Sequence, residues 1–117
     1  KHPKVSWVSF SGLEKDSQHE LAKKYLPKGS CGVISFGVVG GREAAVKFMD
    51  SLKLAAIVTH VADARTCVLH PASTTHSEGT KEELLAQGIQ ENSVRLSIGI
   101  ENVEDIIEDL EEAFKAI

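Results

Sequence analysis

The chain has 117 residues, a net charge of −4 and 42% hydrophobic residues. This size and balance predict one soluble domain, residues 1–117, and argue against a membrane protein. Acidic residues outnumber basic ones by 17 to 13. Because nucleic acids and anionic membrane surfaces are bound through clustered positive charge, neither is an expected partner.

The start of the chain and its two thiols carry further expectations. The chain begins at Lys1 without an initiator Met, and its one Met is Met49. We therefore expect these residues to be a piece of a longer protein. Cys31 and Cys67 each lie in or beside an apolar run, which predicts two buried reduced thiols. Thiols that stay reduced favour a cytoplasmic location.

Hydrophobic periodicity switches along the chain between the period of strands and the period of helices. Helix starts are indicated by capping boxes at Ser17–Glu20 and Thr80–Glu83 and by Asn102, whose side-chain oxygens can accept from free backbone N–H groups. Helix ends are indicated by Pro27 and Gly88. In chain order the predicted elements are a strand at 5–10, a helix at 18–26, a strand at 31–38, a helix at 42–52, strands at 54–58 and 66–69, a helix at 81–86, a strand at 94–98 and a helix at 103–117.

This order predicts an α+β fold, an α/β sandwich in which helices cover a small sheet. The first strand carries apolar residues on both faces, with Val5 and Trp7 on the same side. The strand at 94–98 alternates cleanly, so Arg95 and Ser97 lie on the face opposite its apolar residues.

Arg95 is the first candidate for a functional residue. A guanidinium held on a rigid strand presents a planar fork that matches a carboxylate through two parallel hydrogen bonds. The alternative is an arginine on an edge strand that is simply solvated. The residues alone leave both interpretations open.

The segment from His70 to Thr80 is the second candidate, because it is rich in hydroxyl and imidazole groups and has almost nothing to bury. Ordinary turn chemistry explains the same composition. Potential metal ligands gather in this region, namely His60, Cys67, His70 and His76. Their spacing matches no metal-binding pattern, so no metal site is predicted. The residues by themselves form no complete catalytic set.

The second half of the chain carries a specific likeness. The segments HPASTTHS at 70–77, Gly88-Ile89 and VRLSIGIEN at 94–102 resemble the C-terminal signature of the Cys/Met-metabolism enzymes that use pyridoxal phosphate. The likeness extends over all 117 residues. Within that family, the chain most resembles the O-acetylhomoserine sulfhydrylase branch. The additional matching stretches are 1–5, 21–27 and 36–41.

The resemblance implies the fold of the C-terminal domain of fold-type I pyridoxal phosphate enzymes, a small, mostly antiparallel sheet with helices packed on it. It implies that Arg95 grips the α-carboxylate of an amino-acid substrate and that Thr75 lies close to the same pocket. His60 stands where the family usually carries Asn, Ser or Glu facing the substrate, which leaves the exact substrate open. The cofactor is expected on a lysine of an upstream domain, so residues 1–117 would hold no catalytic or cofactor-binding residue and would be inactive alone.

The implied function is a transferase reaction of methionine biosynthesis, in which sulfide or a thiol replaces the acetate of O-acetylhomoserine and gives homocysteine or methionine. A methionine or cystathionine γ-lyase, or a cystathionine γ-synthase, shares the Arg95 motif. From a different class, a free-standing small-molecule-binding domain would use the Arg95 face without chemistry. The resemblance also implies a cytoplasmic homotetramer that includes the upstream cofactor domain. The sulfur donor stays open.

Overall fold

A five-stranded sheet organises the computed structural model, which describes residues 2–117. The strands are β1 (Val5–Ser9), β2 (Val33–Val38), β3 (Ala56–Ile57), β4 (Cys67–Leu69) and β5 (Ser93–Ser97). The helices are α1 (His19–Tyr25), α2 (Gly41–Asp50), α3 (Lys81–Ala86) and α4 (Val103–Lys115), with a 3₁₀ turn, η1 (Pro71–Ser73), after β4.

The strand order is β1-β2-β5-β4-β3, which places β5 at the centre of the sheet. Every neighbouring pair is antiparallel except β3 and β4, which are parallel. The predicted α+β class and the mostly antiparallel sheet are both confirmed. The central position of β5 also excludes an edge-strand environment for Arg95.

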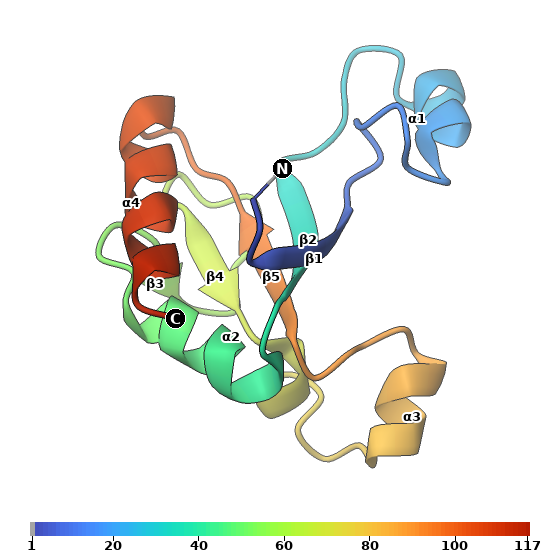
Figure 1. The fold of residues 1–117 in the computed structure, drawn as a ribbon. Coiled ribbons are helices and arrows are strands. Elements are labelled where there is room, and N and C mark those ends of the chain that lie inside the picture. The colour runs from blue at the N-terminus through green and yellow to red at the C-terminus, as the bar shows by residue number, and fades with distance from the viewer. Residues whose placement is uncertain (1) are drawn as a thin grey trace.

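Helices α2 and α4 cover one face of the sheet and build the hydrophobic core with it (Figure 1). Phe48 of α2 is completely buried, and its ring centroid lies 4.4 Å from that of Phe114 on α4. Phe36 of β2 meets Phe48 edge to face at 5.8 Å. These aromatic contacts fix both helices against the same strands, so the opposite face of the sheet is free to carry polar side chains.

Helices α1 and α3 stand away from this core (Figure 1). Helix α1 buries no residue, and Leu21 and Tyr25 remain exposed on it. Helix α3 buries only Leu84. The helices that cover the sheet are thus α2 and α4, whereas α1 and α3 lie apart from the core.

A β-bulge in β1 changes which side chains share a face. Val5 pairs with Val38 while Trp7 pairs with Gly37, so Ser6 is an extra residue between them. Val5 therefore packs against the core, whereas Trp7 lies over the opposite face. The prediction that Val5 and Trp7 share one side is wrong for this reason. A Cβ atom at Gly37 would come within 2.1 Å of the indole nitrogen of Trp7, so only glycine fits beneath this ring.

The helix starts agree with the sequence at two of three positions. Thr80 and Glu83 form the predicted capping box, and the Asn102 side chain accepts from the backbone N–H of Glu104. The predicted box at Ser17 does not form, because Gln18 is the N-cap of α1. There the Asp16 carboxylate accepts from the backbone N–H of Gln18 at 2.9 Å.

The two cysteines lie in different environments, and both are free thiols. Cys67 is buried as predicted, and burial raises the pKa of its thiol. Cys31 is exposed in the segment before β2, so its predicted burial is wrong. The apolar run that suggested burial begins only at Val33, where the strand starts.

Candidate functional site

Arg95 lies in the middle of the central strand β5, on the face opposite α2 and α4. Its cross-strand partners are Ser35 on β2 and Leu69 on β4, so the three side chains share that face. Its neighbours along the strand, Val94 and Leu96, point into the core and are buried. The alternation of β5 therefore holds the half-buried Arg95 on a rigid support, as the sequence pattern predicts.

One hydrogen bond orients the guanidinium. Nη2 of Arg95 donates to the backbone carbonyl of Thr59 at 2.9 Å. Within residues 2–117, Nη1 and Nε of Arg95 find no acceptor and no carboxylate pairs with it. The Arg95 fork thus keeps N–H groups free for an external carboxylate, which a guanidinium binds through two parallel, charge-assisted hydrogen bonds.

The carbonyl that receives Arg95 belongs to the loop at 58–66, between β3 and β4. This loop is tied back to β5, because the backbone N–H of Ala62 donates to the Ser97 hydroxyl at 3.0 Å. Ala62 has a φ of 58°, in the left-handed region that a residue with a side chain adopts at a cost. The loop therefore holds a backbone conformation that its surroundings must impose.

A second tie to the loop passes through Glu101, which the sequence analysis did not single out. The Glu101 carboxylate accepts from the backbone N–H of Thr66 at 2.7 Å and from the Thr66 hydroxyl at 2.8 Å. The backbone N–H of Thr66 is the main reason why the pKa of Glu101 lies below its ordinary value, with burial opposing it. The only sequence signal for Glu101 was its place in the family-like stretch at 94–102.

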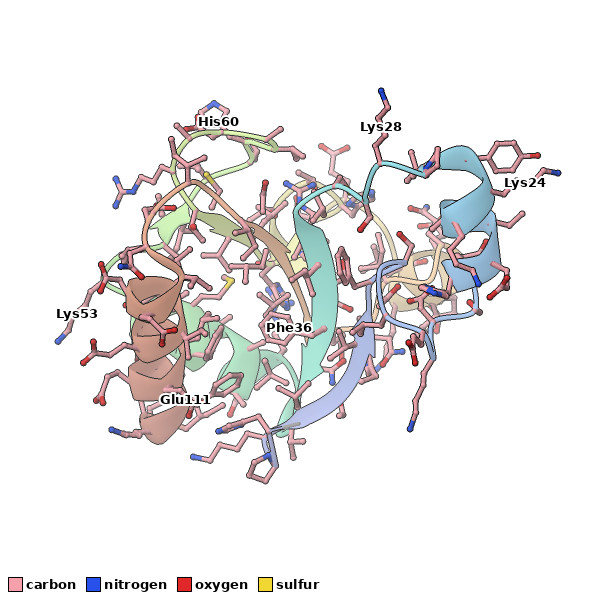
Figure 2. All side chains as sticks on the ribbon, turned by 90° about the horizontal axis from the view of Figure 1, so that it is seen from above. Lys24, Lys28, Phe36, Lys53, His60 and Glu111 are labelled. Carbon is pink, nitrogen blue, oxygen red and sulfur yellow. The ribbon has the colours of Figure 1, made fainter. Side chains whose placement is uncertain are left out.

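His60 follows Thr59 directly in this loop and is exposed. Figure 2 shows its ring at the outer rim of the loop, directed away from the body of the molecule. No hydrogen bond joins His60 to Arg95 within the described residues. The structure thus brings the backbone beside His60 to Arg95, but leaves the imidazole itself facing outward.

Thr75 lies in the polar segment after β4 and is also exposed. Its hydroxyl is 2.9 Å from Nδ1 of His76. It lines a cavity of about 350 Å³ together with other residues of the loop and α3. No contact between Thr75 and Arg95 occurs in the part of the chain that the structure describes.

His70, at the start of the same segment, has a structural role in the fold. It is completely buried, with Nε2 2.7 Å from the carbonyl oxygen of Glu91 and Nδ1 2.8 Å from the Ser73 hydroxyl. The carbonyl can only accept, so Nε2 of His70 donates to it. This arrangement fixes η1 beside β5. Across residues 2–117, no group of three or more His, Cys, Asp or Glu side chains is placed to hold a metal ion.

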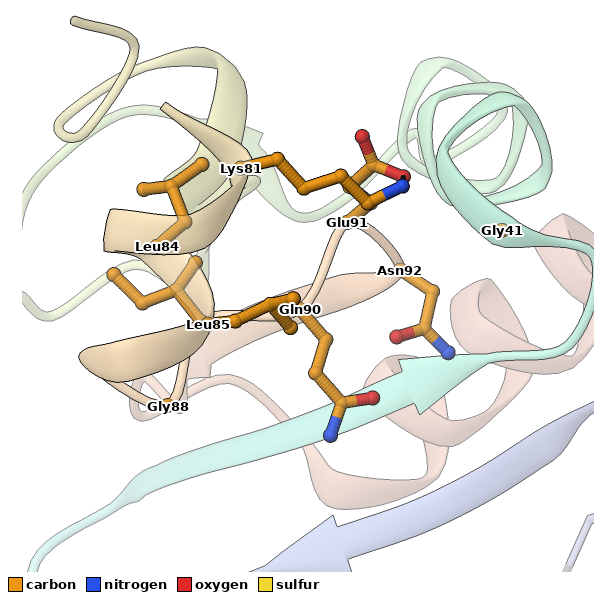
Figure 3. Close-up of a pocket in the computed structure, with 9 residues that line it drawn as sticks. Gly41, Lys81, Leu84, Leu85, Gly88, Gln90, Glu91 and Asn92 are labelled. Atoms are coloured by element: carbon orange, nitrogen blue, oxygen red, sulfur yellow. Dashed lines mark hydrogen bonds and ion pairs between the residues drawn. The ribbon is translucent and has the colours of Figure 1, made fainter. Parts of the chain in front are cut away.

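A separate cavity of about 430 Å³ lies between α3 and the start of α2 (Figure 3). Its wall includes Leu84 and Leu85, and Lys81 pairs there with Glu91 at 3.3 Å. Arg95, His60 and Thr75 do not line it. Lys81 and Glu91 are the two charged residues that line this cavity, and they are paired with each other. The cavity therefore offers no unpaired charged group for chemistry.

The described lysines differ in exposure but share no contact with Arg95 that the structure shows as a hydrogen bond. Lys4 is the least exposed of them, and its Nζ donates to the backbone carbonyls of Phe114, at 2.7 Å, and of Ile117. The others are exposed, and Figure 2 shows Lys24, Lys28 and Lys53 extending into solvent. None shares a hydrogen bond with the Arg95 region within residues 2–117. Among the described helices, none has the length and apolar character needed to cross a membrane.

Comparison with known proteins finds relatives that match the chain over its whole length. The chain is 45% identical over 118 residues to O-acetyl-L-homoserine sulfhydrylase of Leptospira meyeri, covering 100% of the chain and 27% of that protein. It is 48% identical to L-methionine gamma-lyase of Fusobacterium nucleatum subsp. polymorphum, covering 100% of the chain and 29% of that protein. The chain thus spans roughly a quarter of the length of these relatives.

A solved structure gives the same result for the fold. It is a Campylobacter jejuni protein assigned as an O-acetylhomoserine (thiol)-lyase, and it contains an N'-pyridoxyl-lysine-5'-monophosphate residue. It matches with a TM-score of 0.92 and 37% identity over 98% of this chain and 27% of that one. The model of the Cys/Met metabolism PLP-dependent enzyme family matches residues 1–115. This chain belongs to the Cys/Met metabolism family of pyridoxal phosphate-dependent enzymes.

Proposed function

We propose that residues 1–117 bind the substrate α-carboxylate in a pyridoxal phosphate enzyme that makes homocysteine or methionine from O-acetylhomoserine and sulfide or a thiol. The observation that carries this proposal is the half-buried Arg95 on the central strand, with one N–H held by Thr59 and the rest of its fork free of partners among residues 2–117. A rigidly held fork of this kind fixes the position of a carboxylate and hence the orientation of the substrate bonds next to it.

The cofactor and its lysine are, in this proposal, contributed by polypeptide outside residues 1–117. The lysines described above support this, because none of them makes a hydrogen bond to Arg95 or to the loop at 58–66 within residues 2–117. We accordingly expect the 117-residue chain alone to turn over nothing. The protein encoded by the complete open reading frame would be the active enzyme. In it, residues 1–117 would pack with the upstream polypeptide, and the whole protein would assemble as a homotetramer. A cytoplasmic location belongs to the same proposal, supported by the free thiols Cys31 and Cys67.

The experiment is to express the complete open reading frame and supply O-acetylhomoserine with sulfide. Formation of homocysteine is expected, and the 117-residue chain under the same conditions should form none. A complete reading frame whose start codon directly precedes Lys1 would instead favour the free-standing binding domain. Light scattering of the complete polypeptide tests the tetramer.

The alternative activity is that of a methionine or cystathionine γ-lyase, with a cystathionine γ-synthase as a related case. The 48% identity to the Fusobacterium L-methionine gamma-lyase favours considering the lyase specifically. Methionine supplied alone distinguishes it, because a γ-lyase releases methanethiol without any added sulfur donor. If methionine is cleaved and no homocysteine forms from O-acetylhomoserine, the sulfhydrylase proposal is wrong.

His60 and Thr75 enter this proposal as further residues that face the substrate. His60 adjoins Thr59, the carbonyl partner of Arg95, and this proximity in the chain supports a role in substrate choice. Thr75 is supported by its exposed hydroxyl in the polar loop. Replacing His60→Asn should change the preference among O-acetylhomoserine, methionine and cystathionine, whereas His19→Asn serves as a control on α1, which stands away from the sheet. Equal substrate preference in both variants would remove His60 from the site.

A further inference from the structure

Glu101 makes an unusually complete pair with Thr66 for a residue outside the regular elements. Both carboxylate oxygens are used, one by the backbone N–H and one by the hydroxyl of the same threonine. Thr66 is completely buried immediately before β4. The carboxylate thus fixes both the main chain and the side chain of Thr66, and so sets where the loop at 58–66 enters β4.

The Thr66 hydroxyl extends this pairing to the end of β5. It donates to Glu101 and accepts from the backbone N–H of Gly99 at 3.0 Å. A Cβ atom at Gly99 would lie 2.4 Å from Glu101 Oε2 and 2.5 Å from the carbonyl oxygen of Ala64. The close approach of the two segments therefore depends on glycine at this position.

Two further bonds carry the position of Thr66 along the loop towards Arg95. The backbone N–H of Ile100 donates to the carbonyl of Ala64 at 2.9 Å, and the N–H of Ala62 donates to the Ser97 hydroxyl. Three residues before Ala62 lies Thr59, whose carbonyl accepts from Arg95. Hydrogen bonds at Thr66, Ala64 and Ala62 thus hold the loop against residues 97–101, and the backbone from Ala62 to Thr59 links them to the carbonyl that orients the guanidinium.

We infer that Glu101 is a positioning residue for Arg95: by holding Thr66 it holds the loop at 58–66, and the loop presents the Thr59 carbonyl that aims the guanidinium at the substrate carboxylate. This inference rests on the proposed function of Arg95. Arginine has a long side chain with many rotamers, and the Thr59 carbonyl is its one hydrogen-bond acceptor within residues 2–117. If the loop at 58–66 opens, the guanidinium of Arg95 loses this acceptor and is no longer held in one orientation.

The test uses the polypeptide from the complete open reading frame, with two probes that differ only in the carboxylate. The dissociation constants of L-norvaline and L-norvalinamide are measured by calorimetry, and their ratio reports the carboxylate contact within one protein. Hydrogen exchange of a peptide covering 58–66, followed by mass spectrometry, reports loop opening independently of binding.

The variants are chosen to separate charge, hydroxyl and fold. Glu101→Gln places an amide NH₂ group against a donor of Thr66, whereas Glu108→Gln removes the same charge from the exposed side of α4 and is the matched control. Thr66→Val removes the hydroxyl at nearly constant volume. Thr66→Ser, a separate variant, keeps the hydroxyl and removes only the methyl group. If Glu101→Gln does not fold, the two Thr66 variants decide the question.

We expect Glu101→Gln and Thr66→Val to raise exchange at 58–66 and to lower the norvaline preference about tenfold, mainly by weakening norvaline rather than norvalinamide. Glu108→Gln and Thr66→Ser should stay within about twofold of the parent protein. Faster exchange without a change in preference, or no change in exchange, overturns the inference. If Arg95→Ala also leaves the preference unchanged, the proposed function fails as well; if Arg95→Ala alone abolishes it, only the inference fails.

Discussion

Asp109 on α4 connects the last helix to the start of β3, and its replacement is expected to destabilise the fold. One carboxylate oxygen accepts from the backbone N–H of Lys53 at 2.7 Å, and the other accepts from those of Leu54 and Ala55 at 3.1 and 3.0 Å. Three consecutive backbone donors thus depend on one side chain. Asp109→Ala leaves all three without this acceptor, at a junction that is only partly open to water.

The expected loss follows from these three bonds. A hydrogen bond to a charged group contributes about 1.5 kcal/mol at the low end, and Asp109 is half-buried, so about 3 kcal/mol for three is a reasonable sum once partial hydration of the exposed Lys53 N–H is allowed. The higher helix propensity of alanine returns about 0.5 kcal/mol. For 117 residues, an unfolding entropy of about 2.1 cal/mol/K per residue converts the remainder into a fall in Tm of about 10 °C.

The assay is thermal unfolding of the 117-residue chain followed by circular dichroism. Asp109→Asn, which keeps one oxygen, should fall about half as far as Asp109→Ala. Glu108→Gln is the control, because it removes a neighbouring exposed charge that makes no backbone contact in the described structure. If Asp109→Ala shifts Tm no more than this control does, the reasoning that joins α4 to β3 through the carboxylate is refuted.

Three further changes test the loop and its ties. Ala62→Gly should stabilise the chain by about 0.5–1 kcal/mol, since glycine adopts a φ of 58° freely; Ala64→Gly should not, and equal denaturation midpoints would contradict the backbone argument. Gly99→Ala should lower the free energy of unfolding by about 3 kcal/mol, because the added Cβ would lie 2.4 to 2.5 Å from three atoms. Gly32→Ala is the control, since its Cβ would meet nothing closer than 3.4 Å. Similar urea midpoints for the two variants would contradict the close packing at Gly99. The pKa of Glu101 lies below its ordinary 4.5 in the fold, so its stabilisation is complete above that value and is lost as the pH falls through the lower folded pKa. The stability difference between the parent chain and Glu101→Gln should therefore shrink in acid, and a constant difference from pH 7 to about pH 2 would contradict the assignment.

Local chemistry made much of the fold predictable. The caps at Thr80 and Asn102 satisfy N–H groups only a few residues away, so their signal lies entirely within a short window. The alternation of β5 placed Arg95 on the polar face for the same reason, since side-chain direction in a strand depends only on its own residues.

Contacts between distant residues account for the errors. The strand expected at 54–58 shrinks to Ala56–Ile57, because the N–H groups before it bond to Asp109, more than fifty residues later in the chain. The bulge that separates Val5 from Trp7 lies where the indole fits closely over Gly37 of the neighbouring strand β2. Nothing in either segment alone signals such partners.

The candidate site divides in the same way. Arg95 could be predicted from its strand pattern and from the family-like motif. Thr59 and Glu101 could not, because they contribute only a backbone carbonyl and an ordinary acidic side chain. Their roles depend on where the loop at 58–66 folds relative to β5. The roles of His60 and Thr75 were predicted from the resemblance, and they stay predictions. Both side chains are exposed in the structure.

The most direct test of the account measures kcat/KM for O-acetylhomoserine with sulfide in the polypeptide from the complete open reading frame. Arg95→Ala is predicted to lose about 2–4 kcal/mol of carboxylate binding, a fall of roughly 30- to 700-fold, and Arg95→Lys to lose less because it keeps the charge without the fork. Arg42→Ala, which removes an exposed arginine from α2, should leave the value unchanged. An Arg95→Ala enzyme as active as the Arg42→Ala control would contradict the claim that this chain supplies the carboxylate site.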